Sequence, residues 1–271
     1  MKRILMAWIS GLLMGVSGVT HAADTDVSLP APHPALFGLH AAPITVIEPH
    51  RSTSLKPVEV TYSGYPAVAV LDSLLGTQWR NSESLIGFEA KDGYLSMIPA
   101  AQFLRYPAYL VYARADGDDF SVETPPLNNL VKLGPWYLVW DNVLHASLQA
   151  DGATYWPYQV EKIGLVSAPS KAKLFPPMMP ERYREGALLT EKYCLSCHQV
   201  NGVGGRKLPI DLGQWAAAQS FARFATWVLD PSGKNPLTAM PALAPERPAS
   251  ERQLMARQIY GYLRAMGALG K

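Results

Sequence analysis

The stretch Cys194-Leu195-Ser196-Cys197-His198 contains the only two cysteines in a chain of 271 residues. Two thiols separated by two residues and followed directly by a histidine are the sequence pattern at which c-type haem is attached to a protein. The thiols would bond to the two vinyl groups of the porphyrin, and the imidazole would bind the iron as its proximal ligand. A CxxC redox pair that has a histidine beside it by chance is the alternative. The stretch therefore predicts one covalently bound haem c.

Helical periodicity flanks this stretch on both sides. Residues 183–193 lead into it with helical spacing, and residues 251–266 place apolar side chains near every third or fourth position. Gly186 lies in the first of these helices, where the missing side chain would let the two helices cross closely. With the haem motif, residues 181–271 resemble a class I monohaem cytochrome c. The resemblance implies an all-α domain whose first and last helices pack against each other over the haem edge.

A sixth iron ligand is expected from Met240. His198 is the only histidine within residues 181–271, so a second imidazole from this segment is excluded. The stretch Asn235-Pro236-Leu237-Thr238-Ala239-Met240-Pro241 is similar to the ligand loop of that family, and its prolines would stiffen it. A thioether ligand favours a raised reduction potential. The other methionines of this region fit a helix core or a linker better, namely Met255 and Met266, and Met178 and Met179.

Two further residues have roles that the same resemblance implies. Pro209 falls where the family uses a proline carbonyl to accept a hydrogen bond from the proximal imidazole. Trp227, in an expected helix over 221–229, would line the haem pocket or bond a propionate, with simple core packing as the alternative. The stretch Gly202-Val203-Gly204-Gly205 predicts a tight turn, because it lacks the Lys-Ser/Thr sequel of a phosphate-binding loop.

The first half of the chain has a different pattern. Short runs rich in Val, Tyr, Leu and Trp, separated by glycine and proline, predict strands, and Asp92-Gly93 predicts a turn between two of them. The order of these runs resembles the core of the sulfite-oxidase-type molybdopterin domain over residues 56–167, which implies a mixed α+β fold. The runs are residues 60–66, 70–76, 87–94, 98–99, 108–112, 134–140 and 156–163.

This first domain departs from that family in its metal ligand. Enzymes of the family bind molybdenum through a cysteine thiolate, and residues 56–167 contain no cysteine. A Ser or Asp side chain cannot replace a soft anionic sulfur ligand without changing the metal chemistry. We therefore expect no molybdopterin, and we interpret the domain as a docking or interaction module.

Three further segments complete the expected organisation. Residues 1–22 predict a signal peptide for export, with a positive start, an apolar run too short to favour a membrane span, and a small-residue cleavage site. Because the signal has no twin-arginine pair, the prediction is Sec-type export to a bacterial periplasm, with no stable membrane span after signal cleavage. Residues 23–55 predict an extended proline-rich arm, and residues 168–180 predict a proline-rich linker.

The charge is distributed unevenly along the chain. Residues 23–180 contain 10 Lys/Arg and 15 Asp/Glu, a net charge of −5, whereas residues 181–271 contain 12 and 7, a net charge of +5. This asymmetry predicts that the halves contact each other, or that the basic half meets an acidic redox partner. Neither half has the dense basic clustering of a nucleic-acid-binding protein.

Together these features favour an exported electron-transfer protein, or a subunit of a redox complex, over an enzyme. The expected partner is a dehydrogenase, an oxidase or a small electron carrier. The main alternative is a molybdenum-dependent oxidoreductase that delivers electrons to its own haem. A third hypothesis is a haem sensor in which Met240 dissociates to admit a small gas.

Overall fold

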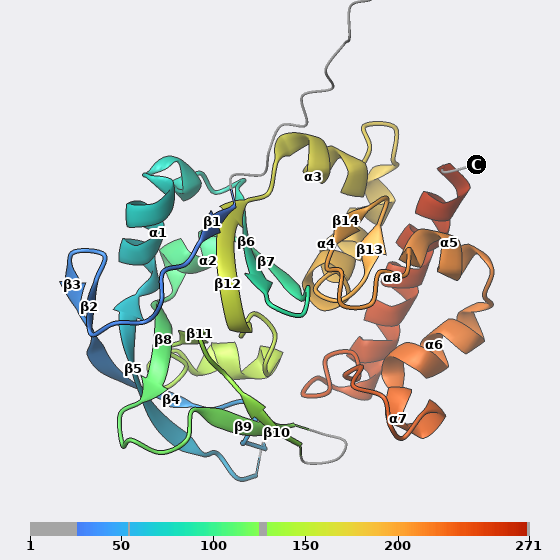
Figure 1. The fold of residues 1–271 in the computed structure, drawn as a ribbon. Coiled ribbons are helices and arrows are strands. Elements are labelled where there is room, and N and C mark those ends of the chain that lie inside the picture. The colour runs from blue at the N-terminus through green and yellow to red at the C-terminus, as the bar shows by residue number, and fades with distance from the viewer. Residues whose placement is uncertain (1–25, 54, 125–128, 270–271) are drawn as a thin grey trace, which may run out of the picture.

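The first half of the chain forms an antiparallel sheet in the computed structural model, which describes residues 26–53, 55–124 and 129–269 (Figure 1). The strand order is β4-β5-β8-β11-β12-β6-β7, and β1 pairs with β12. The strands of this sheet are β1 (Val27–Ser28), β4 (Ala42–Ile47), β5 (Glu59–Pro66), β6 (Leu85–Ala90), β7 (Leu95–Pro99), β8 (Ala108–Arg114), β11 (Trp136–Trp140) and β12 (Tyr158–Leu165). The predicted signal peptide, residues 1–22, lies outside the described residues.

Two small hairpins and several short helices accompany the sheet. The hairpins pair β2 (Ala35–Leu36) with β3 (Leu39–His40), and β9 (Ser121–Thr124) with β10 (Asn129–Lys132). The helices are α1 (Ala67–Leu75), η1 (Gln78–Arg80), α2 (Ala100–Arg105) and η2 (Ala146–Asp151), and α1 contacts β5 and β8. The protein is therefore a mixed α/β structure built on a curled antiparallel sheet.

Most of the predicted strands are present, but the run over 70–76 is helical. Ala67, Val70, Leu71 and Leu75 are buried on one face of α1, and their spacing of three to four residues fits a helix. The run had no alternation of polar and apolar residues, so its apolar content alone could not distinguish a strand from a buried helix. The turn at Asp92-Gly93 is confirmed, because β6 and β7 pair across it and Gly93 has a φ of 84°.

The predicted extended arm and the predicted proline-rich linker both contain regular secondary structure. The arm over 23–55 contributes β4, which pairs with β5 along the edge of the sheet and buries Val46 completely. The linker over 168–180 begins with helix α3 (Ala168–Leu174). Ser167 caps this helix by accepting from Ser170, and its proline lies in the first turn, where no hydrogen bond is lost. Proline content therefore misled the prediction at a helix start.

Helices predominate after the linker. The elements are η3 (Glu181–Tyr183), α4 (Arg184–Tyr193), β13 (Gln199–Val200), β14 (Val203–Gly204), α5 (Leu212–Ala217), α6 (Phe221–Leu229), α7 (Pro231–Lys234) and α8 (Ala249–Leu269). The β13–β14 hairpin lies between α4 and α5, so the region is helical with one small sheet. Helix α8 extends the predicted range of 251–266 by a few residues at each end.

Gly186 brings α4 and α8 together as the sequence predicted. A Cβ atom at this position would lie 2.2 Å from the carbonyl oxygen of Gln258 and 2.8 Å from the Cβ of Tyr262. These distances are too short for any side chain, so glycine is required for this crossing. The crossing holds the residues that precede the cysteine motif against the C-terminal helix.

The buried apolar side chains form two clusters. The first lies within the sheet and its helices, and it contains Trp136, Tyr137, Trp140 and Trp156, an aromatic concentration that packs as core. The second lies among α4, α5, α6 and α8, but it also includes Met97 from β7, Leu174 from α3 and Met179. The second cluster therefore is not confined to residues 181–271, because it also includes side chains from the sheet and the linker.

Candidate functional site

The stretch Cys194–His198 forms a tight turn directly after α4. The backbone N–H of His198 donates to the carbonyl of Cys194 at 3.1 Å. Within the turn, the side chain of Leu195 is buried, with 1% of its surface exposed. Gly204 at the end of β14 and the following Gly205 pack against the turn. A Cβ atom would lie 2.2 Å from the carbonyl oxygen of His198 at Gly204, and 2.0 Å from that of Ser196 at Gly205. The tight turn predicted over residues 202–205 is confined to Asn201–Gly202, because Val203 and Gly204 form β14. The glycines that follow the turn support the cysteine motif.

The imidazole of His198 is oriented by a backbone hydrogen bond. Its Nδ1 lies 3.0 Å from the carbonyl oxygen of Leu208, to which it donates when protonated at that atom. This arrangement leaves Nε2 as the ligand atom. Burial lowers the pKa of His198, although the bond to Leu208 acts in the opposite direction, and a lowered pKa favours the neutral form that binds metals.

The acceptor for His198 differs from the sequence prediction by one residue. Pro209 was expected to supply the carbonyl, but Leu208 does so, and the N–H of Leu208 in turn donates to Cys197 at 2.9 Å. That second bond fixes the carbonyl of Leu208 next to the imidazole ring. Proline has no N–H, so position 209 could not make the same pair of bonds.

Both thiols of the motif are free and lie in surroundings that raise their pKa. Burial raises the pKa of Cys194 to about 12, and it also raises the pKa of Cys197. Disulfide oxidoreductases depend on the opposite shift, because a low pKa produces the attacking thiolate. The direction of these shifts disfavours the CxxC redox alternative.

Met240 lies half-buried in the irregular segment between α7 and α8, with its side chain packed against the second core cluster. Its N–H donates to the Thr238 hydroxyl at 3.2 Å, and the nearby N–H of Leu243 donates to Val228 of α6 at 2.7 Å. Met255 and Met266 are buried on α8, and Met179 is buried too, as core side chains. Trp227 is half-buried on α6, so its predicted contact with a haem stays a prediction.

The residues of this region fit a haem by their donor chemistry. Two neutral thiols, an oriented imidazole and a thioether lie in segments that contact one apolar cluster. Leu208 and Ile210 beside His198 are about half exposed, and Leu237 beside Met240 is 72% exposed. These exposed apolar side chains, at the two segments expected to supply the iron ligands, are of a kind that an apolar porphyrin would cover.

The sheet contacts the cysteine motif directly. The N–H of Leu95 donates to the carbonyl of Ser196 at 2.9 Å, and the N–H of Arg206 donates to the carbonyl of Gly93 at 2.7 Å. The Ser196 side chain also hydrogen-bonds to Tyr94. The β6–β7 region is thus bonded through its backbone to the motif at Ser196 and to the segment after β14 at Arg206.

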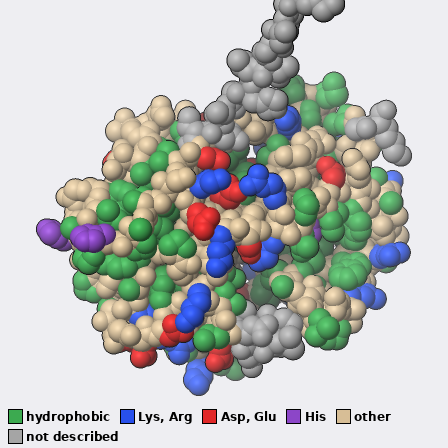
Figure 2. All heavy atoms as spheres, viewed as in Figure 1, with side chains coloured by type: hydrophobic (Ala, Val, Ile, Leu, Met, Phe, Trp, Pro, Cys, Tyr) green, Lys and Arg blue, Asp and Glu red, His purple; other side chains and the backbone are tan. Residues whose placement is uncertain are grey.

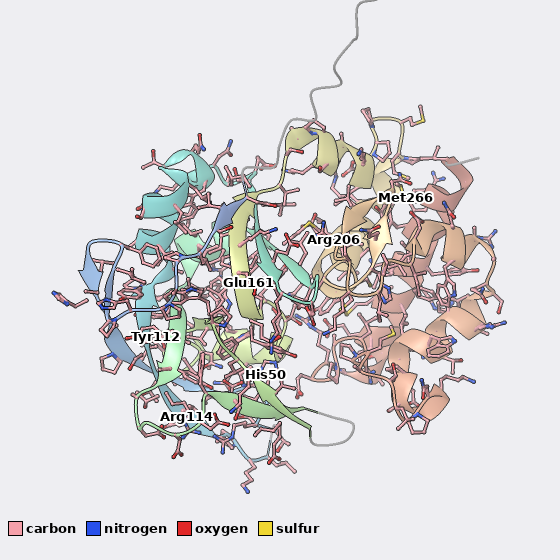
Figure 3. All side chains as sticks on the ribbon, viewed as in Figure 1. His50, Tyr112, Arg114, Glu161, Arg206 and Met266 are labelled. Carbon is pink, nitrogen blue, oxygen red and sulfur yellow. The ribbon has the colours of Figure 1, made fainter. Side chains whose placement is uncertain are left out.

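Ion pairs continue this contact along the join between the two parts of the chain. Lys207 lies 2.8 Å from Asp92, Arg206 pairs with Glu89, and Asp151 receives both Lys192 and Arg247. Figure 2 shows acidic and basic side chains gathered along this join, and Figure 3 labels Arg206 beside the β6–β7 turn. The predicted contact between the acidic and basic halves is therefore present.

Other features of the described residues do not add a second site of the same kind. A hollow of about 210 Å³ at the join is lined by residues such as Glu89, Leu95, Val203 and Arg206, and its lining includes neither cysteine, His198 nor Met240. Within residues 26–53, 55–124 and 129–269, no three His, Cys, Asp or Glu side chains are grouped to hold a metal ion. No helix in these ranges is long and apolar enough to cross a membrane.

Sequence reasoning missed two carboxylates in the part of the chain that precedes the linker and forms the sheet, which we call the sheet half. Glu48 is completely buried and accepts hydrogen bonds from His50, Tyr62 and Tyr137, at 2.7 to 3.1 Å. Asp151 links two segments of the C-terminal half. Neither residue belongs to a recognisable motif, so only the fold reveals their partners.

Comparisons of the chain with models of protein families, with curated proteins and with solved structures give no match.

Proposed function

We propose that the protein is an exported c-type cytochrome that transfers one electron at a time. One haem would be attached through Cys194 and Cys197, with His198 and Met240 as its axial ligands. The single observation that carries the proposal is the orientation of the His198 imidazole. This imidazole belongs to the same turn as both thiols, and the carbonyl of Leu208 orients it. A ligating histidine whose second nitrogen donates to a carbonyl is the usual arrangement of such a site.

The haem, when bound, would supply the redox-active iron, and the residues of this chain would set its properties. Leu208 would hold the imidazole in one tautomer and one orientation. The thioether of Met240 would favour the reduced iron and raise the potential. The apolar side chains of Leu208, Ile210 and Leu237 would keep water from the ring.

The finer division of the chain is part of the same proposal. Residues 181–271 would be a class I cytochrome c domain, and residues 56–167 a sulfite-oxidase-type core without molybdopterin that serves as a docking or interaction module. Its support is the crossing of α4 and α8 at Gly186 and the antiparallel sheet before it. A dehydrogenase, an oxidase or a small carrier in the bacterial periplasm would be the redox partner.

A reductive titration with optical detection tests the proposal. The protein should take up one electron per chain, and its oxidised form should show the far-red charge-transfer band of a thioether–iron bond. Met240→Ala should keep the covalent haem but lose this band, whereas Met178→Ala, at a methionine that is 76% exposed, should leave it intact. A band that survives Met240→Ala would contradict the ligand assignment. Rapid binding of carbon monoxide to the reduced parent protein would favour a sensor instead.

A further inference from the structure

One carboxylate of the sheet half contacts both the helix that precedes the cysteine motif and the segment that follows Met240. Asp151 lies at the end of η2, and its Oδ2 is 2.7 Å from the Nζ of Lys192, while its Oδ1 is 2.9 Å from the Nη2 of Arg247. The hydroxyl of Tyr193 lies 3.4 Å from the same Oδ1. Asp151 therefore uses both oxygens to join two parts of the C-terminal half.

The two cations hold defined places relative to the proposed ligands. Lys192 is on the last turn of α4, six residues before His198. Arg247 is seven residues after Met240 and two residues before the start of α8. The segment between Met240 and α8 contains no helix or strand, so its position depends on individual contacts.

Other contacts place Arg247 firmly at this point. Its Nη1 pairs with Glu251 of α8, and the side chain of Glu246 lies beside Gly152, 3.7 Å from where a Cβ atom would stand. The segment after Met240 thus reaches the sheet half at two neighbouring residues. At its other end, Leu243 is bonded to α6.

The pairing is partly shielded from water. Asp151, Lys192 and Arg247 are 23%, 22% and 31% exposed at their side chains. Burial alone would raise the pKa of Asp151, but the hydrogen bonds from Lys192 and Arg247 outweigh it and the pKa is lowered. Charges in such a site are less screened by salt than those on an open surface.

We propose that Asp151 is a positioning residue for the haem ligands. Through Asp151, the sheet half holds the segment that follows Met240 in a fixed position relative to the helix that precedes His198. This inference rests on the proposed function. It gives the first half of the chain a role in the ligation of a haem bound by the second half. Supporting residues of this kind orient metal ligands without touching the metal.

The test is a comparison of holoproteins with different residues at 151. In Asp151→Asn the segment should open more often, so added imidazole should displace the thioether with an apparent affinity about five- to tenfold higher than in the parent protein, because apparent affinity scales with the open fraction. The charge-transfer band should weaken and the midpoint potential should fall. Asp151→Glu keeps a carboxylate at this position, so its imidazole affinity, band and midpoint potential should stay close to those of the parent protein. Asp119→Asn, which breaks the Lys132 pair within the sheet half, should change none of these readouts.

A second variant provides a test in case Asp151→Asn does not fold. Arg247→Gln removes the contact between Asp151 and the Met240 segment, together with the Glu251 pair, and it should reproduce the tighter binding of imidazole. Amide exchange over residues 238–247 of the haem-free chain should also become faster in either variant. Unchanged imidazole affinity and exchange in both variants would overturn the inference. A parent protein with no covalent haem or no charge-transfer band would instead overturn the proposed function.

Discussion

The backbone N–H of Leu95 donates to the carbonyl oxygen of Ser196 at 2.9 Å, so the sheet is bonded to the middle residue of the cysteine motif. Ser196 lies between the two thiols, and any shift of β7 would therefore act on both of them. Met97, two residues further along β7, is buried in the cluster below the motif. The sheet half is accordingly part of the support of the proposed haem site.

Gly93, at the turn of this contact, should tolerate substitution poorly. It has a positive φ of 84°, and a Cβ atom would lie 3.1 Å from the carbonyl carbon of Arg206. Gly117 has a similar φ of 79° with no atom within 4 Å of the same position, so it serves as the matched control. Both alanine variants should lose about 1 kcal/mol from backbone strain, and Gly93→Ala should lose about 1 kcal/mol more from the contact. Urea unfolding measures both values, and equal losses would contradict the contact.

Gly186→Ala should separate α4 from α8. A methyl group there would overlap the carbonyl oxygen of Gln258, and overpacking of this kind costs about 1 to 3 kcal/mol. Gly261→Ala, on α8 with 3.7 Å to the nearest ring atom, should be neutral or stabilising, because alanine favours a helix. Thermal unfolding of the two variants provides the comparison. A Gly186→Ala variant as stable as the parent would show that the helices do not cross here.

The buried Glu48 should make stability depend on acid pH. Burial acts to raise its pKa, but the bonds from His50 and Tyr62 outweigh burial, so the folded pKa lies below the ordinary 4.5. A depressed pKa adds stability above pH 4.5, and this contribution is lost as the pH falls through the folded value. Glu48→Gln should cost about 2 to 4 kcal/mol at pH 7, because one amide oxygen cannot accept from every donor. The cost should shrink on acidification, and the exposed Glu59→Gln serves as the control. A cost that does not change with pH would contradict this role.

Glu191 on α4 should have the opposite effect. Burial raises its pKa to about 7, so the folded state binds a proton more tightly than the unfolded state. Stability should therefore fall as the pH rises from 4.5 through 7. Glu191→Gln should stabilise the protein at pH 8 by at most about 3 kcal/mol, the equivalent of the full shift, and less where partial exposure screens the charge. At pH 4 the two proteins should be equally stable. Urea unfolding at both pH values measures this difference in stability. A variant that is less stable than the parent protein at pH 8 would contradict the raised pKa of Glu191.

The sequence predicted the local features that depend on neighbouring residues. The turn at Asp92-Gly93, the helix after residue 250 and the close approach at Gly186 all follow from backbone preferences or helical spacing. The proline-rich segments were harder, because proline is compatible with a helix start as well as with an extended chain. Helix α3 shows this, with Ser167 as its cap.

Features that depend on distant residues could not be predicted. Glu48 and Tyr137 are 89 positions apart, and Asp151 and Arg247 are 96 positions apart. A carboxylate in a sequence has no sign of which hydroxyl or cation will meet it after folding. The shift of the His198 acceptor from Pro209 to Leu208 has a local cause, since the loop is closed by the N–H of Leu208.

Iron and molybdenum analysis of the purified protein, made in a host that matures both cofactors, decides whether the protein is a monohaem cytochrome. We expect one iron per chain, a haem that remains on the Cys194–His198 peptide after acid extraction, and no molybdenum. A chain without covalent haem would contradict the proposed cytochrome. Stoichiometric molybdenum would show that the protein is an enzyme that delivers electrons to its own haem.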